Sequence, residues 1–567
     1  MSLPLLDINA PGRRLVETIN AILRGDWWRP RTDAEVQAGV YPQDYRYPPG
    51  DVRRYGALGD GVSDDTAAIQ RAIDISELDG SGVYLPRGIY AVTALRIDVA
   101  DGFRMYGDGY ESVLRGASAG TQIILLAERT GYTAISGLHL ENFRVDGNSG
   151  GEFEAGLIQL NNCVGFVVNG LWIENGSRAS SPSGVNGIAF SAGTVGGTGS
   201  IGSITNCYIR NCSKAAINWT SEAVAGYIAG NVIRDCTGNG SCPGIQLNGG
   251  FNGRVIGNYV TNTQGPGIYV AVSGVGATSR NAIIAGNSIN ACGASSTTLG
   301  DGILIANASG TAVGRFVIAD NQVYDCGNAT GGGAGIHVQN DDNIVITGNL
   351  CRNNQYDGIR VLNCNHVAIN GNRCTGNNLA GVSYAGGVQI RGTCAHVAIT
   401  GNHCSDDKAT KTQSYGIILD SSATLTYLTI ADNHLEGNDI GPLLADTVGV
   451  PSRISMIGEM QTTDGSTTNM QYFTLPDNCA AHLFAAVVGK NSAASDRAIY
   501  TREAVLYRDG GGATLQGSVT TLGTDVESAA AWGGASIDAS SNSVRLRVTG
   551  DTATTIDWRG RIELEVI

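Results

Sequence analysis

Ile346-Thr-Gly-Asn349 is one copy of a phrase that the chain repeats eight times, an aliphatic residue followed by two further residues and Asn. The copies end at Asn231, Asn258, Asn287, Asn321, Asn349, Asn372, Asn402 and Asn433, so that successive copies are 23 to 34 residues apart. Self-similarity at this period is typical of a solenoid, in which each repeat buries its apolar side against its neighbours.

A second phrase accompanies the first, a Gly followed by alternating apolar residues, as in Gly358-Ile-Arg-Val361. Alternation with a period of two predicts half-buried strands, and the repeats contain no helical periodicity of useful length. Asn and Gly suit the corners between strands because both tolerate left-handed backbone conformations. Stacked Asn side chains can also hydrogen-bond along the axis, as in other amide ladders. These patterns predict an all-β parallel β-helix.

Composition narrows the class of protein. The net charge is −14 and Gly accounts for 80 of 567 residues, without a collagen period. The negative charge speaks against nucleic acid or an anionic membrane as partner, and no apolar run reaches the ~18 residues of a membrane span. The start, Met1 to Asp7, is too short for a signal-peptide core. We therefore expect synthesis in a cytoplasm and release by a route such as lysis.

Seven of the thirteen cysteines keep register with the repeats, at positions that hold core aliphatic residues elsewhere: Cys212, Cys236, Cys292, Cys326, Cys351, Cys374 and Cys404. Cys351, Cys374 and Cys404, for example, each lie two residues after a corner Asn. No CxxC pair is present, which disfavours a zinc site. We expect reduced, buried structural thiols and neither a metal nor a cofactor.

The chain divides into three expected parts: residues 1–50, 51–450 and 451–567. In the first part, residues 13–23 have the pattern of a short amphipathic helix that either docks to a partner or caps the first coil. The second part is the solenoid, and its opening predicts a capping helix from about Ala67 to Ile75. The third part lacks the repeat and predicts a small antiparallel β-sandwich.

The opening of the solenoid resembles a known superfamily. The stretch Tyr55-Gly-Ala-Leu-Gly-Asp-Gly-Val-Ser-Asp-Asp-Thr66, with Val83-Tyr-Leu-Pro86 and Gly88-Ile-Tyr90, is similar to the start of pectate-lyase-like right-handed parallel β-helix proteins. That superfamily includes polygalacturonases, alginate epimerases and bacteriophage tailspike depolymerases. The Asp-Pro-His motif of the epimerases and the Asn-Thr-Asp and Gly-His-Gly motifs of polygalacturonases are absent. The strands around residues 502–507, 544–550 and 558–562 resemble C-terminal domains of phage tail fibres and tailspikes.

The resemblance implies a virion protein of a phage tail, made in the host cytoplasm and released by lysis, with a secreted protein as the alternative. It implies a homotrimer attached to the tail through its N-terminus, with a bacterial capsular, exo- or lipopolysaccharide as target. The implied activity is polysaccharide cleavage, by glycoside hydrolysis with two carboxylates or, less favoured, by β-elimination. The rival hypothesis is a non-catalytic receptor-binding tail fibre or adhesin on the same scaffold.

The densest set of outward polar positions falls on the coils that contain Gly335, Gly358 and Gly387. We expect the catalytic groups to be Asp357, Asp341, Asp342, His337 and Arg360, with Gln339, Tyr356, Gln389 and Arg391 binding substrate. Hydrolysis needs two carboxyl groups at a set separation, and elimination needs a base and a group that stabilises the enolate.

A second candidate patch combines an insertion and an aromatic residue near the first coils: Glu152, Glu154 and Trp172. Insertions on one face of a solenoid often form its binding face. A third set, Arg373, His403 and His434, forms a basic column one residue after successive corner Asn residues, with metal binding disfavoured.

Overall fold

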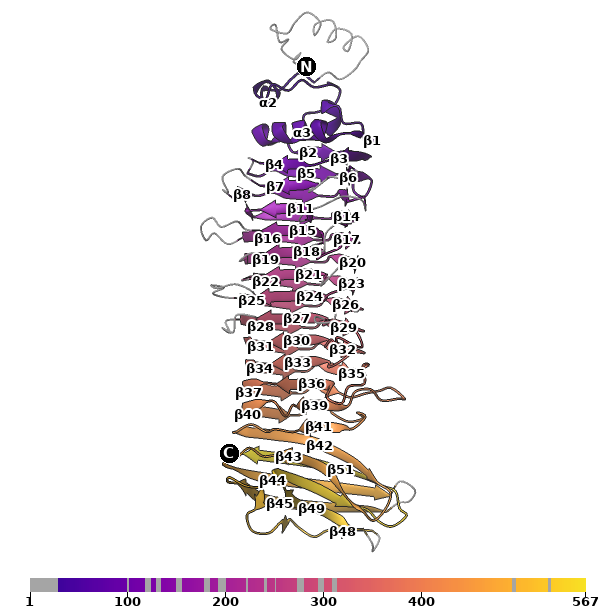
Figure 1. Ribbon diagram of the computed structural model, residues 1–567, viewed down its shortest axis with the longest axis vertical. Coiled ribbons are helices and arrows are strands. Elements are labelled where there is room, and N and C mark those ends of the chain that lie inside the picture. The colour runs from indigo at the N-terminus through magenta and orange to yellow at the C-terminus, as the bar shows by residue number, and fades with distance from the viewer. Residues whose placement is uncertain are drawn as a thin grey trace, which may run out of the picture. The chain divides into compact units, whose positions relative to one another are not determined.

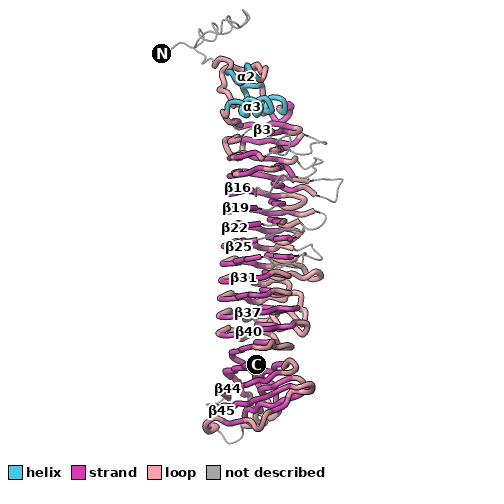
Figure 2. Tube along the Cα trace, turned by 90° about the vertical axis from the view of Figure 1, so that its left-hand side faces the viewer, coloured by secondary structure: helices cyan, strands magenta, loops and turns pink. Residues whose placement is uncertain are grey.

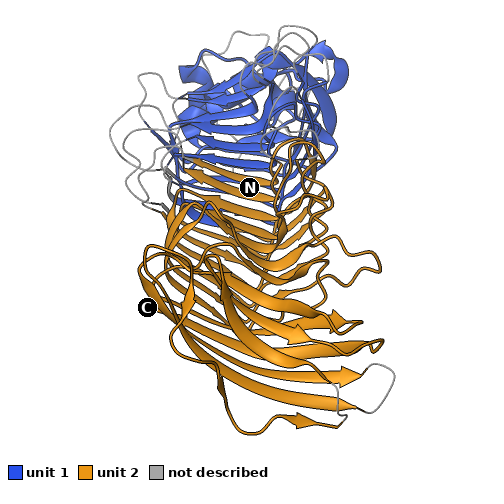
Figure 3. Cartoon of the chain, turned by 60° about the horizontal axis from the view of Figure 1, so that its bottom comes forward, with its two compact units in different colours: residues 1–254 blue, residues 255–567 orange. Residues whose placement is uncertain are grey.

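The structure is a computed structural model of the whole chain, which divides into two compact units, residues 1–254 and 255–567 (Figure 3). It describes residues 29–98, 101–117, 124–128, 134–148, 156–177, 184–191, 200–220, 223–238, 242–249, 251–272, 280–293, 300–307, 314–491, 496–528 and 532–567. Each unit is described by itself. The expected helix at residues 13–23 lies outside the described residues.

The described part of the first unit begins with three helical elements, and a buried ion pair joins the first two. The three elements are α2 (Asp33–Gln37), the 3-10 turn η1 (Val52–Tyr55) and α3 (Thr66–Asp79). Arg54 Nε lies 2.6 Å from Glu35 Oε1, and both side chains are fully buried. Burial alone would raise the pKa of Glu35, but the Arg54 contact and the Thr32 N–H lower it overall. Helix α3 buries Ile69 and Ile73 ahead of the first strands.

Three parallel sheets make up the coils of the first unit (Figures 1 and 2). The first sheet contains β2 (Val83–Leu85), β5 (Arg104–Gly107), β9 (His139–Glu141), β13 (Phe166–Asn169), β16 (Ser200–Thr205), β19 (Ala223–Ala229) and β22 (Phe251–Ile256). The second contains β1 (Asp60–Asp64), β3 (Gly88–Val92), β6 (Ser112–Gly116), β10 (Arg144–Asp146), β14 (Trp172–Glu174), β17 (Tyr208–Arg210) and β20 (Val232–Cys236). The third contains β4 (Leu95–Ile97), β7 (Leu125–Ala127), β11 (Gly156–Asn161), β15 (Asn186–Ser191), β18 (Ile217–Thr220) and β21 (Ile245–Asn248), and β8 (Ile135–Ser136) pairs with β12 (Cys163–Val164).

The second unit has the same three-sheet coil. Its first sheet contains β25 (Arg280–Ala285), β28 (Gly314–Ala319), β31 (Asp342–Thr347), β34 (Asn365–Asn370), β37 (Thr393–Thr400) and β40 (Thr424–Ala431). Its second contains β23 (Tyr259–Thr263), β26 (Ser288–Asn290), β29 (Gln322–Tyr324), β32 (Leu350–Arg352), β35 (Arg373–Thr375) and β38 (His403–Cys404). Its third contains β24 (Ile268–Val272), β27 (Ile303–Asn307), β30 (Ile336–Gln339), β33 (Ile359–Leu362), β36 (Gly386–Arg391), β39 (Tyr415–Leu419) and β41 (Gly441–Ala445). The predicted parallel β-helix is confirmed.

The corner asparagines of the second unit form a continuous buried ladder, as predicted. In each step an Asn Nδ2 donates to the Oδ1 of the next, at 2.9 Å from Asn321 to Asn349 and again from Asn349 to Asn372. The ladder runs through Asn258, Asn287, Asn321, Asn349, Asn372, Asn402 and Asn433. A second amide ladder, which the repeat phrase did not reveal, joins Asn354, Asn377, Gln413 and Asn438.

All thirteen cysteines lie in the described part of the chain, and all are buried and free of disulfides. Cys351, Cys374 and Cys404 stack in register on the second sheet. Burial raises the pKa of Cys207 to about 12, which keeps this thiol protonated and unreactive. The prediction that cysteines replace core aliphatic residues is confirmed.

After the last coil the second unit becomes antiparallel. Strand β42 (Ser452–Thr462) continues the first sheet beside β40 and then pairs along its length with β51 (Ile556–Val566). The sheet continues through β44 (Cys479–Asn491), β45 (Arg497–Arg508) and the short strands β46 (Thr514–Leu515), β47 (Thr520–Thr521) and β48 (Val526–Glu527). A separate sheet contains β43 (Thr467–Thr474), β50 (Ser543–Thr549) and β49 (Gly534–Ser540). The division at residues 50 and 450 stays a prediction.

Within the described ranges, no helix is both long enough and apolar enough to span a bilayer.

Candidate functional site

A column of polar side chains crosses the third sheet of the second unit. The strand register aligns His337 of β30 with Arg360 of β33 and Gln389 of β36. Leu304 and Ile418 flank this column and are almost fully buried, and so is Gln389. The residues expected to form an open patch are therefore adjacent, but Gln389 is buried and His337 and Arg360 are only slightly exposed.

Asp357 is the centre of the column's first polar group. Its side chain is fully buried, and Arg360 Nη2 lies 2.6 Å from its Oδ2. Its Oδ1 accepts the Gly386 N–H at 2.8 Å. Burial raises the pKa of Asp357 despite the Arg360 charge and the Gly386 N–H, which both lower it. This carboxyl group therefore takes up a proton more readily than an exposed Asp.

Arg360 connects Asp357 to the next coil and to an aromatic ring. Its Nε also donates to Gln389 Oε1 at 3.1 Å, and its guanidinium carbon lies 5.3 Å from the centre of the Tyr356 ring. Gln389 Nε2 in turn donates to the Tyr384 carbonyl at 3.0 Å. These contacts fix the orientation of the guanidinium group, which is only slightly exposed.

Asp301 and His337 form the second polar group. His337 Nδ1 lies 3.2 Å from Asp301 Oδ2, and Asp301 Oδ1 accepts the Ala334 N–H at 2.7 Å. Burial alone would raise the pKa of Asp301, but the His337 contact and the Ala334 N–H lower it overall. Within the described ranges, His337 Nε2 is buried and has no hydrogen-bond partner. A carboxylate on Nδ1 favours the tautomer whose Nε2 lone pair is free to accept a proton.

From the sequence, Asp301 was expected to lie two coils below Asp357, but it was not among the expected catalytic residues, although the sequence carries a further signal for it. Asp301-Gly-Ile303 and Asp357-Gly-Ile359 are the same phrase at the same position of two coils. In both, the carboxylate accepts a backbone N–H from the following coil. A comparison of the repeats by phrase would have paired the two residues.

Asp341 and Asp342 lie apart from this group. Asp357 precedes β33 and Asp341 follows β30, so the four-residue width of the sheet, about 13 Å at ~3.3 Å per residue, separates them. Asp341 is fully buried and accepts the Gly314 N–H, while Asp342 accepts the Asn365 N–H. Both carboxylates hold the corner between sheets, so the expected pairing of either with Asp357 was wrong.

Gln339 and Arg391 also lie toward that end of the third sheet. Gln339 aligns with Leu362, which aligns with Arg391. Arg391 Nε lies 3.5 Å from Asp420 Oδ2. Both residues lie on the outward surface of the sheet. Among the described residues, neither contacts the polar groups around Asp357 and Asp301.

The expected patch in the first unit is described only around Trp172, because Glu152 and Glu154 lie outside the described residues. Trp172 stacks on Tyr208 with ring centres 3.9 Å apart and donates from Nε1 to Glu174 Oε2 at 3.0 Å. Glu174 is fully buried and forms ion pairs with Arg144 and Arg210. The two arginines neutralise this carboxylate, which makes it a structural group.

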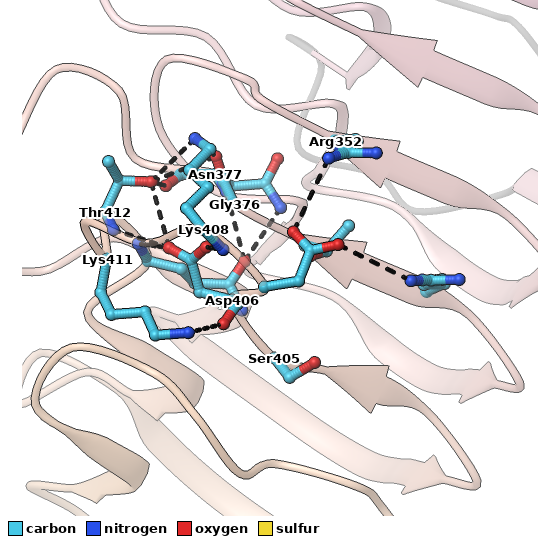
Figure 4. Close-up of polar contacts among 12 residues, drawn as sticks. Arg352, Gly376, Asn377, Ser405, Asp406, Lys408, Lys411 and Thr412 are labelled. Carbon is cyan, nitrogen blue, oxygen red and sulfur yellow. Dashed lines mark hydrogen bonds and ion pairs between the residues drawn. The ribbon is translucent and has the colours of Figure 1, made fainter.

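The basic column at His403 continues into a loop that is held by its own carboxylate. His403 and His434 have ring centres 4.4 Å apart. Figure 4 shows Asp406 at the centre of the loop, where it accepts N–H groups from Lys408, Thr412 and Gln413. Burial alone would raise the pKa of Asp406, but these donors lower it overall. The loop is thus rigidly anchored.

Metal binding has no candidate centre in the described ranges, since no three His, Cys, Asp or Glu side chains cluster suitably there.

Two family models match adjoining parts of the chain. Residues 51–297 match the model described as "Rhamnogalacturonase A/epimerase, pectate lyase-like", and residues 297–450 match "Right handed beta helix region". Residues 51–297 are thus similar to pectate-lyase-like proteins, and residues 297–450 are similar to right-handed β-helix regions. The resemblance found in the opening motif is thereby confirmed.

Individual proteins that the chain resembles are carbohydrate-active. The Azotobacter vinelandii mannuronan C5-epimerase AlgE4 is 49% identical over 78 residues, 14% of this chain and 14% of the relative. Its A-module has a TM-score of 0.50 at 19% identity, covering 71% of this chain and 99% of the module. A capsule K30/K69-specific depolymerase of Klebsiella phage K5-2 is 32% identical over 149 residues, 22% of this chain and 18% of the relative.

A tailspike of E. coli bacteriophage HK620, solved with a hexasaccharide, has a TM-score of 0.50 at 12% identity and covers 90% of this chain and 93% of its own. This likeness shows the fold. The sequence matches span less than a fifth of the length of AlgE4 and of the Klebsiella phage depolymerase.

Proposed function

We propose that the chain is a tailspike-like depolymerase that binds and cleaves a bacterial capsular, exo- or lipopolysaccharide. The observation that carries the proposal is His337, whose Nδ1 is held by Asp301 while its Nε2 has no partner in the described ranges. This is the arrangement of an oriented general base. The sequence match to a phage capsule depolymerase supports the substrate class.

The chemistry that this arrangement supports best is β-elimination on a uronate. His337 Nε2 takes the proton from the carbon beside the sugar carboxylate, the electron pair forms a carbon–carbon double bond, and the glycosidic oxygen leaves with its chain and takes up a proton from water. Arg360 lies on the adjacent coil and is suited to pair with the sugar carboxylate as charge develops on it. Because the pKa of Asp357 is raised, Asp357 can accept a proton when the sugar carboxylate competes for Arg360.

Glycoside hydrolysis is the second candidate, favoured by the two Asp-Gly-Ile phrases. Asp301 and Asp357 occupy equivalent positions two coils apart, a spacing of about 9.6 Å at ~4.8 Å per coil. That spacing lies at the upper end of the range for an inverting pair. Their pKa values also shift in opposite directions, as an acid and a base require. Elimination is preferred because both carboxyl groups are held by protein partners, whereas His337 Nε2, the proposed base, has no partner in the described ranges.

The test is His337→Gln, compared with His366→Gln on an exposed histidine of the first sheet. We expect the first variant to lose at least about a hundredfold in turnover and the second to keep it, because general-base catalysis contributes that much or more. Elimination leaves an unsaturated sugar end that absorbs in the ultraviolet, whereas hydrolysis leaves a saturated reducing end.

Full turnover by His337→Gln would refute the role of this residue. Saturated product ends would select hydrolysis. If the unmodified protein binds a panel of host polysaccharides but cleaves none, the non-catalytic receptor-binding hypothesis replaces the enzyme.

The proposed setting of this activity is a phage tail. We propose a homotrimer that attaches to the virion through residues 1–50, after synthesis in the host cytoplasm and release by lysis. The similarity to pectate-lyase-like proteins and the resemblance of residues 451–567 to tail-fibre domains support this proposal.

A further inference from the structure

A cleft of about 790 Å³ opens in the second unit, where the last coil meets the antiparallel sheet. Residues 435–442 form one wall, and strands β42, β51 and β44 form the floor. The strand register places Glu459, Arg559 and Val488 side by side across that floor. The volume falls within the range of ordinary ligand sites, about 300–1,000 Å³.

The cleft combines exposed apolar groups with amides. Ile440 is 58% exposed and Val488 is 45% exposed, although both line a concave surface. Gln461 lies beside them and donates to Asp557, while Asn438, which also lines the cleft, is already bonded to Gln413. A sugar ring has an apolar face and a rim of hydroxyl groups, so it matches this alternation better than a purely apolar or purely ionic ligand does.

The excess of negative charge in the cleft determines which class of sugar it can bind. Glu436, Asp439, Glu459 and Asp557 outnumber Lys490 and Arg559. Arg559 forms an ion pair with Glu436, and its Nε lies 3.7 Å from Glu459 Oε1. Burial, and then the nearby Glu436 carboxylate, raise the pKa of Glu459. The excess of carboxylates repels uronates and other anionic sugars.

We propose that this cleft is a binding site for a neutral oligosaccharide segment, separate from the His337 group. Arg559 and the carboxyl groups of Glu436 and Glu459 hydrogen-bond the hydroxyl rim, while Ile440 and Val488 contact the apolar face. The proposal rests on the proposed function for the class of ligand, but not for the chemistry at His337. A neutral segment held here would keep a long polymer attached between cleavage events.

The experiment measures binding by the full-length protein carrying His337→Gln, so that ligand is not consumed. The probes are two panels of purified bacterial oligosaccharides, one neutral and one containing uronic acids, in a calorimeter. Arg559→Ala is compared with Arg561→Ala, two residues along the same strand, where the side chain is 65% exposed and pairs with Glu563 outside the cleft. Val488→Ser is compared with Val505→Ser, an exposed valine of β45.

We expect neutral oligosaccharides to bind to the protein. Arg559→Ala should lower their affinity by about tenfold or more, because that is the loss expected for hydrogen bonds to a charged group. Val488→Ser should also lower the affinity for neutral oligosaccharides, and the two control variants should leave it unchanged. The proposal is overturned if no neutral oligosaccharide binds, or if both cleft variants bind like their controls.

The two proposals fail separately. If the unmodified protein cleaves polysaccharide but both cleft variants bind oligosaccharide as their controls do, only the proposal about the cleft is refuted. If both cleft variants bind oligosaccharide more weakly but the unmodified protein cleaves no polysaccharide, only the proposed enzymatic function is refuted.

Discussion

Replacing Asn349 by Ala should lower the free energy of unfolding of the β-helix by more than the loss of one amide group would suggest. Asn349 Oδ1 accepts both the backbone N–H and the side-chain Nδ2 of Asn321, at 3.0 and 2.9 Å. Its Nδ2 donates to the Ile318 carbonyl and to Asn372 Oδ1. All of these asparagines are buried, so water cannot replace the missing partner.

The magnitude follows from the two Asn321 donors that lose their acceptor. A buried donor left without a partner costs about 1–3 kcal/mol, so the pair costs about 2–6 kcal/mol. Gln322→Ala is the matched control, because Gln322 follows the corner at Asn321 on the preceding coil but is exposed. An exposed substitution of that kind should stay within about 0.5 kcal/mol.

Two measurements check this reasoning. Urea unfolding of both variants gives the change in stability, and hydrogen exchange reports the backbone N–H of Asn321 directly. We expect Asn349→Ala to lower the unfolding midpoint and to speed exchange at Asn321, while Gln322→Ala changes neither. Equal midpoints for the two variants, with the Asn321 N–H still protected, would refute the view that the ladder carries stability.

Two further predictions concern acid stability and assembly. Asp406 has a lowered pKa, so its carboxylate contributes stability above its usual value of 3.8 and loses it as the pH falls through its lower folded value. Asp406→Asn should therefore destabilise the protein at pH 7 in thermal melts, by an amount that shrinks below that usual value; a constant difference would contradict the argument. Sedimentation should give three times the chain mass of 58.8 kDa, because a closed symmetric trimer is expected for a tailspike-like protein. A monomer at micromolar concentration would count against the virion assignment.

The sequence predicts the solenoid well because each coil repeats the same local constraints. The corner Asn and the Gly-initiated strand recur on the turns from Asn231 to Asn433, and they fix the register that aligns His337, Arg360 and Gln389. The amide ladder follows from the same recurrence. The second ladder was missed although Asn354, Asn377 and Asn438 each lie five residues after a corner Asn, because Gln413 breaks that spacing.

The site was predicted less well, because function depends on where a residue falls along the width of a sheet. Asp341 and Asp357 lie on adjacent coils and near each other in sequence, but at opposite ends of their strands. Asp301 lies farther away in sequence and occupies the equivalent position. The cleft was not predictable from the repeats, since Glu436 meets Arg559 across 123 residues.

The two Asp-Gly-Ile phrases show that the same carboxylate-to-backbone hydrogen bond can occur at positions with different chemical roles. Asp301 and Asp357 both accept an N–H from the next coil, which fixes each carboxyl group in the same position. Their roles differ because of the outward side chain that each one meets. Asp301 meets an imidazole and leaves its far nitrogen free, while Asp357 meets a guanidinium and holds it in place. A β-helix can therefore acquire a site by substituting outward positions, without disturbing the inward residues that hold its coils together.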